Sequence, residues 1–174
     1  MYKYKNIGFR PIDENDLEIL RINRNDSETL LFLGSVDLVS SEQQKEWWKS
    51  LSRSKTQLWF CVFEEKYANV VGVLRFQNID YINKCCEIGA DIFPEFRGRG
   101  LGIDVYEMAL EYLFCHFNIN TVYLRVAEFN KRGIDLYKKI GFKETGYIPE
   151  SIFRDNKYWQ TKFFSFIRSD YKRE

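Results

Sequence analysis

The sequence RGRGLG occupies residues 97–102 and follows an apolar run, residues 87–93, that predicts a β-strand. Residues 103–117 come next and have the apolar spacing of an amphipathic helix. A strand, a glycine-rich turn and a helix N-terminus in this order favour anion binding. Glycine lacks the Cβ atom that would keep a ligand away, and the first helical N–H groups have no intrahelical partner. The two arginines add donors suited to phosphate oxygens, so the turn predicts a phosphate-containing ligand.

Two common phosphate-binding motifs do not fit this turn. A P-loop needs lysine and then serine or threonine after its last glycine, but Ile103 and Asp104 follow Gly102. A dinucleotide-binding turn needs a third glycine or alanine, and counting from Gly98 and Gly100 that position holds Ile103. The spacing that remains is an arginine at position 97 followed by glycines at positions 100 and 102.

Composition limits the class of protein. The chain is 45% hydrophobic and 29% charged, which predicts a single soluble domain over residues 1–174. A net charge of +1 provides no global field for nucleic acid or a membrane surface, so neither is expected as a partner. No apolar run reaches the roughly 18 residues of a membrane span. The four cysteines form no CxxC pair and His116 is the only histidine, so we expect no metal, reduced thiols and a cytoplasmic location.

The remaining patterns predict alternating strands and helices. Strands are expected at residues 7–10, 58–64, 70–77, 84–93, 121–126, 142–148 and 158–168, with polar loops after the second and between the last two. Helices are expected after Asp13, after Ser40 or Ser41, and over residues 130–140. The first carries two apolar pairs, Leu17 with Leu20 and Ile19 with Ile22. The order β-α-α-β-β-β-α-β-α-β-β predicts a mixed sheet with helices on both faces.

Two motifs together resemble the GNAT superfamily of acyl-CoA-dependent N-acetyltransferases. RGRGLG after the strand CEIGADIF is similar to the family pattern Gln/Arg-x-x-Gly-x-Gly/Ala. Asn130 followed by LYKKIGF at residues 136–142 is similar to a second family pattern. The resemblance covers the whole chain and implies the GNAT fold, an α/β structure with a mostly antiparallel sheet. RNDSE and SSEQQKEWW in the first half resemble the ribosomal-protein, spermidine and nucleotide-amino-sugar acetyltransferases.

This resemblance implies how acetyl-CoA, the co-substrate, is bound. Backbone groups around Asp91 and Ile92 would pair with the pantetheine arm as an added strand does. Asn130 would contact the same arm, although it also suits a helix cap. The pyrophosphate would bind the glycine turn, whose residues are Arg97, Gly98, Arg99, Gly100, Leu101 and Gly102.

The resemblance also implies that Tyr137 is the catalytic acid. A phenol has a reference pKa of about 10, so it stays protonated until the thiolate of CoA leaves. The alternative is a core aromatic that packs at helical spacing with Ile134 and Ile140.

Glu87 is the implied catalytic base, which would remove a proton from the amine through water. Strand alternation puts Glu87, Gly89 and Asp91 on one face. The alternative is a solvated carboxylate at a strand end. Asp91 and Glu128 are poorer candidates, and His116 near a helix C-terminus is not expected to be catalytic.

The acceptor implied by the resemblance is the primary amine of a small molecule: a polyamine, an amino sugar or a nucleotide-linked amino sugar. Two alternatives stay open, a protein N-terminal amine, as in ribosomal-protein acetyltransferases, and a non-catalytic acyl-CoA-binding module. Residues 24–39 and the last hairpin would recognise the acceptor, and the last strands offer an edge for a homodimer. Many relatives have an aspartate where this chain has Gln160. Candidate acceptor contacts are Asn25, Asp26, Glu28, Tyr147, Tyr158 and Trp159.

Overall fold

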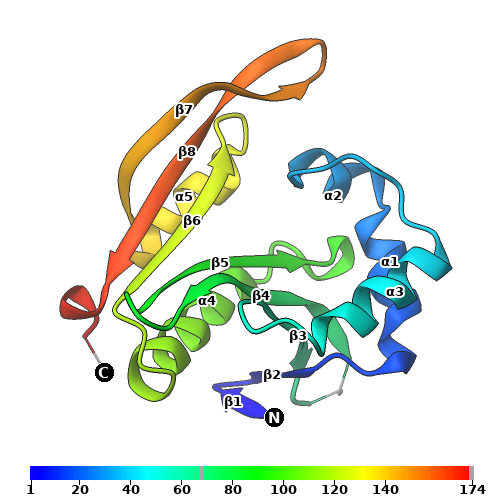
Figure 1. Ribbon diagram of the computed structural model, residues 1–174, viewed down its shortest axis with the longest axis horizontal. Coiled ribbons are helices and arrows are strands. Elements are labelled where there is room, and N and C mark those ends of the chain that lie inside the picture. The colour runs from blue at the N-terminus through cyan, green and yellow to red at the C-terminus, as the bar shows by residue number, and fades with distance from the viewer. Residues whose placement is uncertain (67–68, 173–174) are drawn as a thin grey trace.

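The computed structural model describes residues 1–66 and 69–172, which form one eight-stranded sheet with helices on both faces (Figure 1). The strand order is β1-β2-β3-β4-β5-β6-β8-β7. The strands are β1 Tyr2–Tyr4, β2 Ile7–Pro11, β3 Leu58–Glu64, β4 Val70–Asp80, β5 Cys85–Ile92, β6 Thr121–Ala127, β7 Lys143–Arg154 and β8 Lys157–Ile167. The α-helices are α1 Leu17–Arg24, α2 Ser27–Phe32, α3 Ser41–Leu51, α4 Leu101–Glu111 and α5 Lys131–Ile140.

The predicted fold class is confirmed, with two additional elements. Strand β1 has three residues and helix α2 has six. Elements this short span too few residues to show a period, so the sequence pattern could not reveal them. The loop predicted between β3 and β4 contains residues 67 and 68, which lie outside the described residues.

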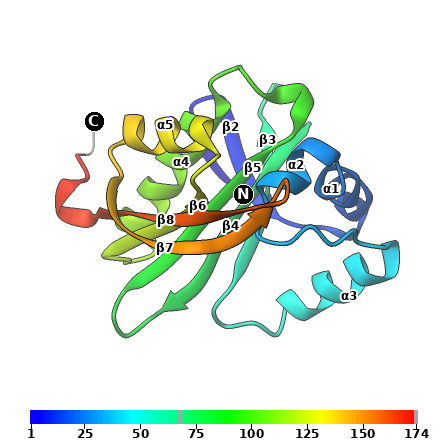
Figure 2. The ribbon, with the colours of Figure 1, turned by 90° about the horizontal axis from the view of Figure 1, so that it is seen from above.

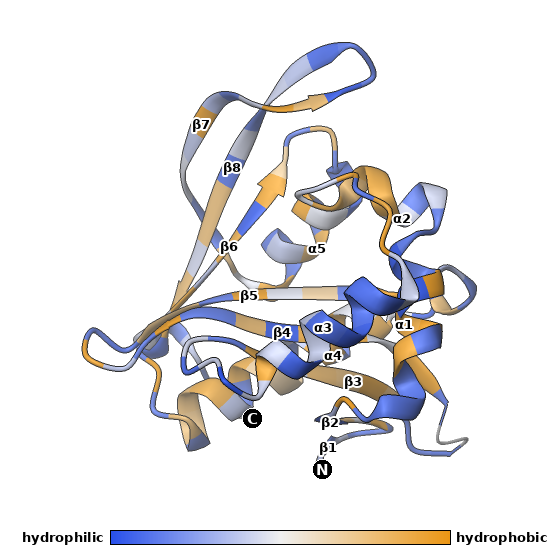
Figure 3. Cartoon of the chain, turned by 45° about the vertical axis from the view of Figure 1, so that its right-hand side comes forward, coloured by the Kyte–Doolittle hydropathy of each residue, from blue (hydrophilic) through white to orange (hydrophobic). Residues whose placement is uncertain are grey.

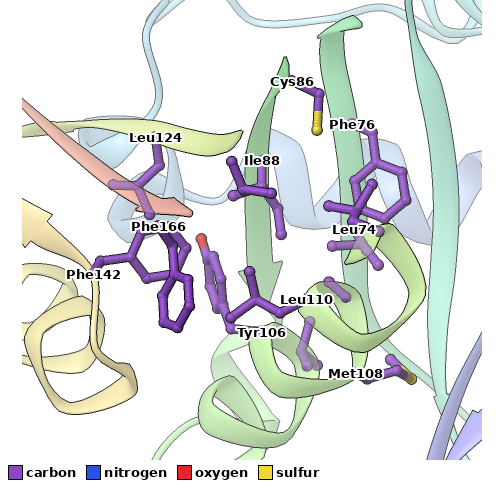
Figure 4. Packing of buried hydrophobic residues seen from close by; sticks show 14 of the residues in the cluster. Leu74, Phe76, Cys86, Ile88, Tyr106, Met108, Leu110, Leu124, Phe142 and Phe166 are labelled. Carbon is purple, nitrogen blue, oxygen red and sulfur yellow. The ribbon is translucent and has the colours of Figure 1, made fainter. Parts of the chain in front are cut away.

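The main hydrophobic core lies between the sheet and helices α4 and α5 (Figure 2). Figure 4 shows Leu74 and Phe76 of β4 and Ile88 of β5 packed near Tyr106 and Met108 of α4. A smaller cluster on the opposite face joins α1 and α3 to the sheet. Trp47 and Trp48 of α3 are partly buried and pack against this cluster. Two cores on opposite faces fix the sheet between its helical layers.

Two predicted helices differ in detail. In α1, Leu17 and Leu20 are buried, but Ile22 is 56% exposed and Ile19 is also at the surface, so only the leucine pair faces the core. Helix α4 begins at the glycine turn, two residues before the predicted start. It passes into a π-helical turn, Tyr112–His116, where the sequence predicted a continuous α-helix.

The prediction of a polar loop between the last two strands was wrong. Strands β7 and β8 extend to Arg154 and Lys157 and are closed by a two-residue turn. Asp155 and Asn156 in this turn have φ values of 52° and 55°. Positive φ at both positions matches the right-handed twist of the strands, which makes such turns common in hairpins. The hairpin therefore projects well beyond the end of β6 (Figure 1).

Strands β5 and β6 separate after a short paired segment. They run parallel, and their pairing joins residues 85–87 to residues 121–123. Beyond it, β5 continues along β4 to Ile92, while β6 continues along β8 to Ala127. Figure 1 shows β6 and the β7–β8 hairpin turning away from β5. We call this opening the splay; the glycine turn follows β5 at its wide end.

Within the described residues, no helix is both long and apolar enough to cross a membrane.

Candidate active site

The splay exposes the backbone edge of β5 that faces β6. The Phe93 N–H donates to the Val71 carbonyl at 2.9 Å, so Phe93 faces β4. Backbone groups of successive strand residues point in alternate directions, which turns Ile92 and Ala90 towards the splay. An extended ligand can add to such an edge as a strand does. The alternation favours Ala90 and Ile92 over Asp91 for backbone contacts.

The glycine turn has the conformation that its sequence predicts. Gly98 and Gly100 both have φ of +82°, in the left-handed region that side chains disfavour. A Cβ atom at either glycine would meet nothing within 4 Å, so their outer surface is open to a ligand. Gly100 caps α4, and the unpaired N–H groups of the first helical turn follow it. Backbone angles and the helix terminus together are typical of a turn that can bind an anion.

The two arginines of the turn differ in their contacts. The Arg97 Nε donates to the Ile92 carbonyl at 2.9 Å, and its Nη2 donates to the Thr29 Oγ1 at 2.7 Å. Arg99 donates to the Glu95 carbonyl at 3.1 Å and lies over the Phe96 ring at 5.0 Å. The expectation that both side chains offer free donors to phosphate therefore fails for Arg97, which is turned into the protein.

Tyr137 on α5 contacts a second tyrosine that sequence reasoning missed. Its hydroxyl lies 3.4 Å from that of Tyr106 on α4, and the two rings meet edge to face at 5.3 Å. Burial raises the pKa of both phenols, and the nearby Asp91 carboxylate raises the pKa of Tyr137 further. Tyr137 also packs against the main core, so its packing and its predicted acid chemistry are compatible. Tyr106 carried no motif; only the folded helix pair reveals it.

The alternative interpretation of Glu87, a solvated carboxylate at a strand end, disagrees with the structure. Glu87 is only 8% exposed. Its Oε2 accepts from the Asn78 Nδ2 at 2.8 Å, and its Oε1 accepts from the Arg125 Nε at 2.7 Å. Asn78 lies at an irregularity of β4, with φ of 50°. Arg125 reaches across from β6, so Glu87 is held between strands at the narrow end of the splay.

Asp91 has a separate set of partners. Its carboxylate forms an ion pair with Arg75 of β4. The Arg75 guanidinium fills the place of a side chain at Gly89, where a Cβ atom would lie 2.6 Å from it. The same guanidinium lies over the Trp59 ring at 5.5 Å. Both carboxylates of β5 are thus ion-paired, Asp91 with Arg75 and Glu87 with Arg125, so these contacts alone do not distinguish the base.

Asn130 caps helix α5, as predicted. Its Oδ1 accepts from the Gly133 N–H at 2.9 Å. A Cβ atom at Gly133 would come within 2.8 Å of the Asn130 Nδ2, so glycine makes this close cap possible.

The predicted acceptor residues divide into structural and exposed groups. Asn25 exchanges two hydrogen bonds with the Val39 backbone, and Asp26 caps α2 by accepting from the Thr29 N–H at 2.8 Å. Trp159 packs against Phe129, with ring centroids 5.4 Å apart. The residues left at the surface are Glu28, Tyr147 and Tyr158. His116 packs against Tyr2 of β1, at the opposite edge of the sheet from the hairpin.

Comparisons with known proteins agree with this geometry. The model of the acetyltransferase (GNAT) domain family matches residues 6–143. The spermidine N(1)-acetyltransferase of Vibrio cholerae is 26% identical over 165 residues, which are 95% of each chain. That of Escherichia coli K12 is 22% identical over 152 residues, 87% of this chain and 81% of the relative. The structure of the Vibrio cholerae spermidine N-acetyltransferase with CoA and spermine has a TM-score of 0.89 at 24% identity, over 95% of this chain and 98% of that one.

Proposed function

Because the chain belongs to the GNAT acetyltransferase family and is an acetyl-CoA-dependent N-acetyltransferase, we propose that its acceptor is a primary amine of a small polyamine. The observation that carries the assignment is the splay beside the glycine turn. It combines an open anion site, a free strand edge and the buried Glu87 in one stretch of β5 and its following turn.

The donor binds along this stretch. Backbone N–H groups of residues 98–102 hold the pyrophosphate. Backbone groups of Ala90 and the Ile92 N–H pair with pantetheine, since the Ile92 carbonyl accepts from Arg97. The Asn130 Oδ1 is used by the helix cap, so its Nδ2 is the group that contacts the arm. A β5 N–H group aimed at the thioester oxygen would stabilise the negative charge that develops there.

The chemistry is direct transfer. The neutral amine attacks the thioester carbon, the carbon–sulfur bond breaks, and the thiolate takes a proton from the Tyr137 hydroxyl. Burial supports this role because it keeps Tyr137 protonated at neutral pH. Its neighbour Tyr106 can donate to the Tyr137 oxygen as charge forms there. Glu87, held by Asn78 and Arg125, accepts the amine proton through water.

The polyamine assignment has two supports. Two relatives that match 95% and 87% of this chain are spermidine acetyltransferases. In addition, Glu28 on α2 has a side chain that is 77% exposed. Its Oε2 lies 3.5 Å from the Arg97 Nη1, and the exposed carboxylate can also receive a second ammonium group of the acceptor. A nucleotide-linked amino sugar would instead need a second phosphate site.

The experiment is thiol release from acetyl-CoA with a panel of amines: spermidine, glucosamine, a nucleotide-linked amino sugar and a peptide with N-terminal alanine. We expect the highest kcat/KM with spermidine, and mass spectrometry to show one added acetyl group. A higher value for the sugar or the peptide overturns the acceptor class. Tight CoA binding by calorimetry with no release for any amine indicates a non-catalytic module.

Assembly stays a prediction. Strand β7 is an edge of the sheet, which suits pairing with a second copy in a homodimer. Sedimentation velocity measures the assembly directly, and a monomer at all concentrations would contradict this prediction.

A further inference from the structure

Helix α2 is held by arginines from two segments that are distant in sequence. Arg97 of the glycine turn donates to the Thr29 Oγ1 at 2.7 Å, and its Nη1 lies 3.5 Å from the Glu28 Oε2. Arg154 of the β7–β8 hairpin donates to the carbonyls of Leu31 at 3.2 Å and Leu33 at 2.7 Å. Figure 2, seen from above, shows the hairpin tip reaching over α2. The helix therefore links the donor side of the splay to the hairpin.

Besides these arginines, α2 has few other contacts. The Phe32 ring packs against Phe129 with centroids 6.0 Å apart, and Asn25 before the helix exchanges hydrogen bonds with the Val39 backbone. Helix α2 has six residues, far below the about 12 that an isolated helix needs, and Thr29 is its buried residue. Phe32 is 50% exposed, and Figure 3 shows hydrophobic residues on α2 apart from the main core. A helix with so small a buried face has low local stability, so its position depends on the arginine contacts.

Arg97 connects α2 to the part of the chain that binds the donor. Its Nε holds the Ile92 carbonyl at 2.9 Å, beside the backbone edge for pantetheine. Its own backbone begins the turn that contains Gly98 and Gly100. A ligand that orders the turn restricts the position of the Arg97 backbone. The Arg97 guanidinium then loses less conformational freedom when it binds Thr29.

We propose that Arg97 is a positioning residue that couples occupancy of the glycine turn to the placement of α2. Acetyl-CoA binding strengthens the Arg97–Thr29 contact and completes the acceptor side of the splay. By linkage, α2 in place raises affinity for acetyl-CoA by the same factor. The effect of the coupling on the acceptor rests on the proposed function. Its effect on the position of α2 does not depend on that function.

The first test is amide hydrogen exchange with and without CoA. The probes are the amides of Leu30 and Leu33, which donate to Asp26 and Leu30 carbonyls at 2.8 and 3.2 Å. In the natural protein we expect CoA to slow their exchange at least about fivefold, the lower end of ordinary coupling. Thr29→Val removes the Oγ1 that accepts from Arg97 and donates to the Asp26 Oδ1, and it leaves the exposed Arg97–Glu28 pair in place. It should therefore reduce this CoA effect, while Thr29→Ser, which keeps the hydroxyl, should preserve it.

Arg154→Gln is the matched control, because Arg154 holds α2 without touching the turn. It should speed exchange of both amides in the absence of CoA, and CoA should still slow them. Equal CoA protection in Thr29→Val and the natural protein overturns the coupling. Loss of CoA protection in Arg154→Gln also overturns it, because Arg97 would then not be the link.

Kinetics provide the second readout. Thr29→Val should raise the acceptor KM at least about fivefold with kcat nearly unchanged, since the residue is remote from the proton transfers. A fall of kcat of the same size, with no change in the acceptor KM, contradicts a positioning role. CoA-dependent protection of α2 without acetylation of any amine leaves the coupling standing and overturns the proposed function; acetylation without CoA-dependent protection does the reverse. Failure of CoA to bind overturns both.

Discussion

The donor side and the acceptor side of the splay are built by different means. On the donor side, the glycine turn has two left-handed backbone angles and leads into α4, whose Val105 and Ala109 are fully buried. On the acceptor side, Arg154 joins the hairpin tip to α2 through the Leu31 and Leu33 carbonyls, and Arg97 joins α2 to the glycine turn. The donor side is anchored in the core, whereas the acceptor side rests on a few polar contacts.

This difference has a consequence for the family chemistry. Core packing tolerates few changes, so the donor site can be kept while the acceptor segments vary. Exposed apolar residues at α2 and the hairpin tip can be replaced without disturbing the sheet. A substitution on the donor side should therefore affect every acceptor alike, and one on the acceptor side should change the preference among amines.

The largest effect is expected for Gly100→Val on the donor side. A β-branched residue at φ of +82° is strained by about 1–3 kcal/mol, and its side chain occupies the open side of the turn. The charge-assisted hydrogen bonds lost to the phosphate cost about 1.5–3 kcal/mol more. Calorimetry should therefore show that CoA affinity falls more than about a hundredfold. Gly146→Val is the matched control, since a Cβ there also meets nothing within 4 Å but φ is not positive, and it should bind CoA normally. Normal CoA binding by Gly100→Val would refute the loop assignment.

The same division explains what the sequence could predict. RGRGLG and LYKKIGF are local patterns, so the turn, the α5 cap and Tyr137 could be recognised before folding. The partners of these residues could not, because they are distant along the chain. Arg125 lies 38 residues from Glu87, and Arg97 lies 68 residues from Thr29.

Two errors on the acceptor side have related causes. Helix α2 has too few residues for an apolar period, and its cap at Asp26 looked like a polar loop. In the hairpin, polar residues mark solvent-exposed strands, and polarity alone does not distinguish an exposed strand from a loop. The sequence predicted a polar loop here, where the hairpin provides Arg154 to hold α2.

Tyr137→Phe should have the next largest effect, on kcat alone. Removing a general acid costs about 10²-fold or more, while the ring that packs in the core is retained. CoA affinity should be unchanged, because the hydroxyl acts on the departing sulfur. Stopped-flow thiol release measures this, with Tyr106→Phe as a control that should lose less. Because burial raises the pKa of Tyr137, no alkaline loss from its ionisation is expected below about pH 10. Unchanged turnover in Tyr137→Phe removes it from the acid role.

Glu87→Gln and Asp91→Asn distinguish the two carboxylates of β5. If Glu87 is the base, its amide variant should lower kcat roughly tenfold or more. Asp91→Asn breaks the ion pair with Arg75 but keeps Glu87, so its kcat should fall less than that of Glu87→Gln. The comparison is read from kcat at one pH with saturating acetyl-CoA and amine. A larger fall of kcat in Asp91→Asn than in Glu87→Gln reverses the assignment.

The smallest expected effect is that of low pH on the local stability of helix α2. The Thr29 backbone N–H holds the pKa of Asp26 below its ordinary value. A carboxylate whose pKa is depressed by folding contributes stability above its unfolded pKa of about 4, and that contribution is lost as pH falls through the folded value. Asn is as good a helix cap but does not titrate, so Asp26→Asn should keep α2 unchanged across this range. We expect the Leu30 amide to exchange a few-fold faster in the natural protein than in Asp26→Asn below about pH 4, and equally at pH 6. Since both proteins are compared at one pH, the intrinsic exchange rate cancels.

The control is the exchange of the α4 amides, which should have equal rates in the two proteins at every pH, because the donor side does not depend on this cap. Faster exchange of the α4 amides in parallel with α2 would mean that the two sides of the splay unfold as one unit.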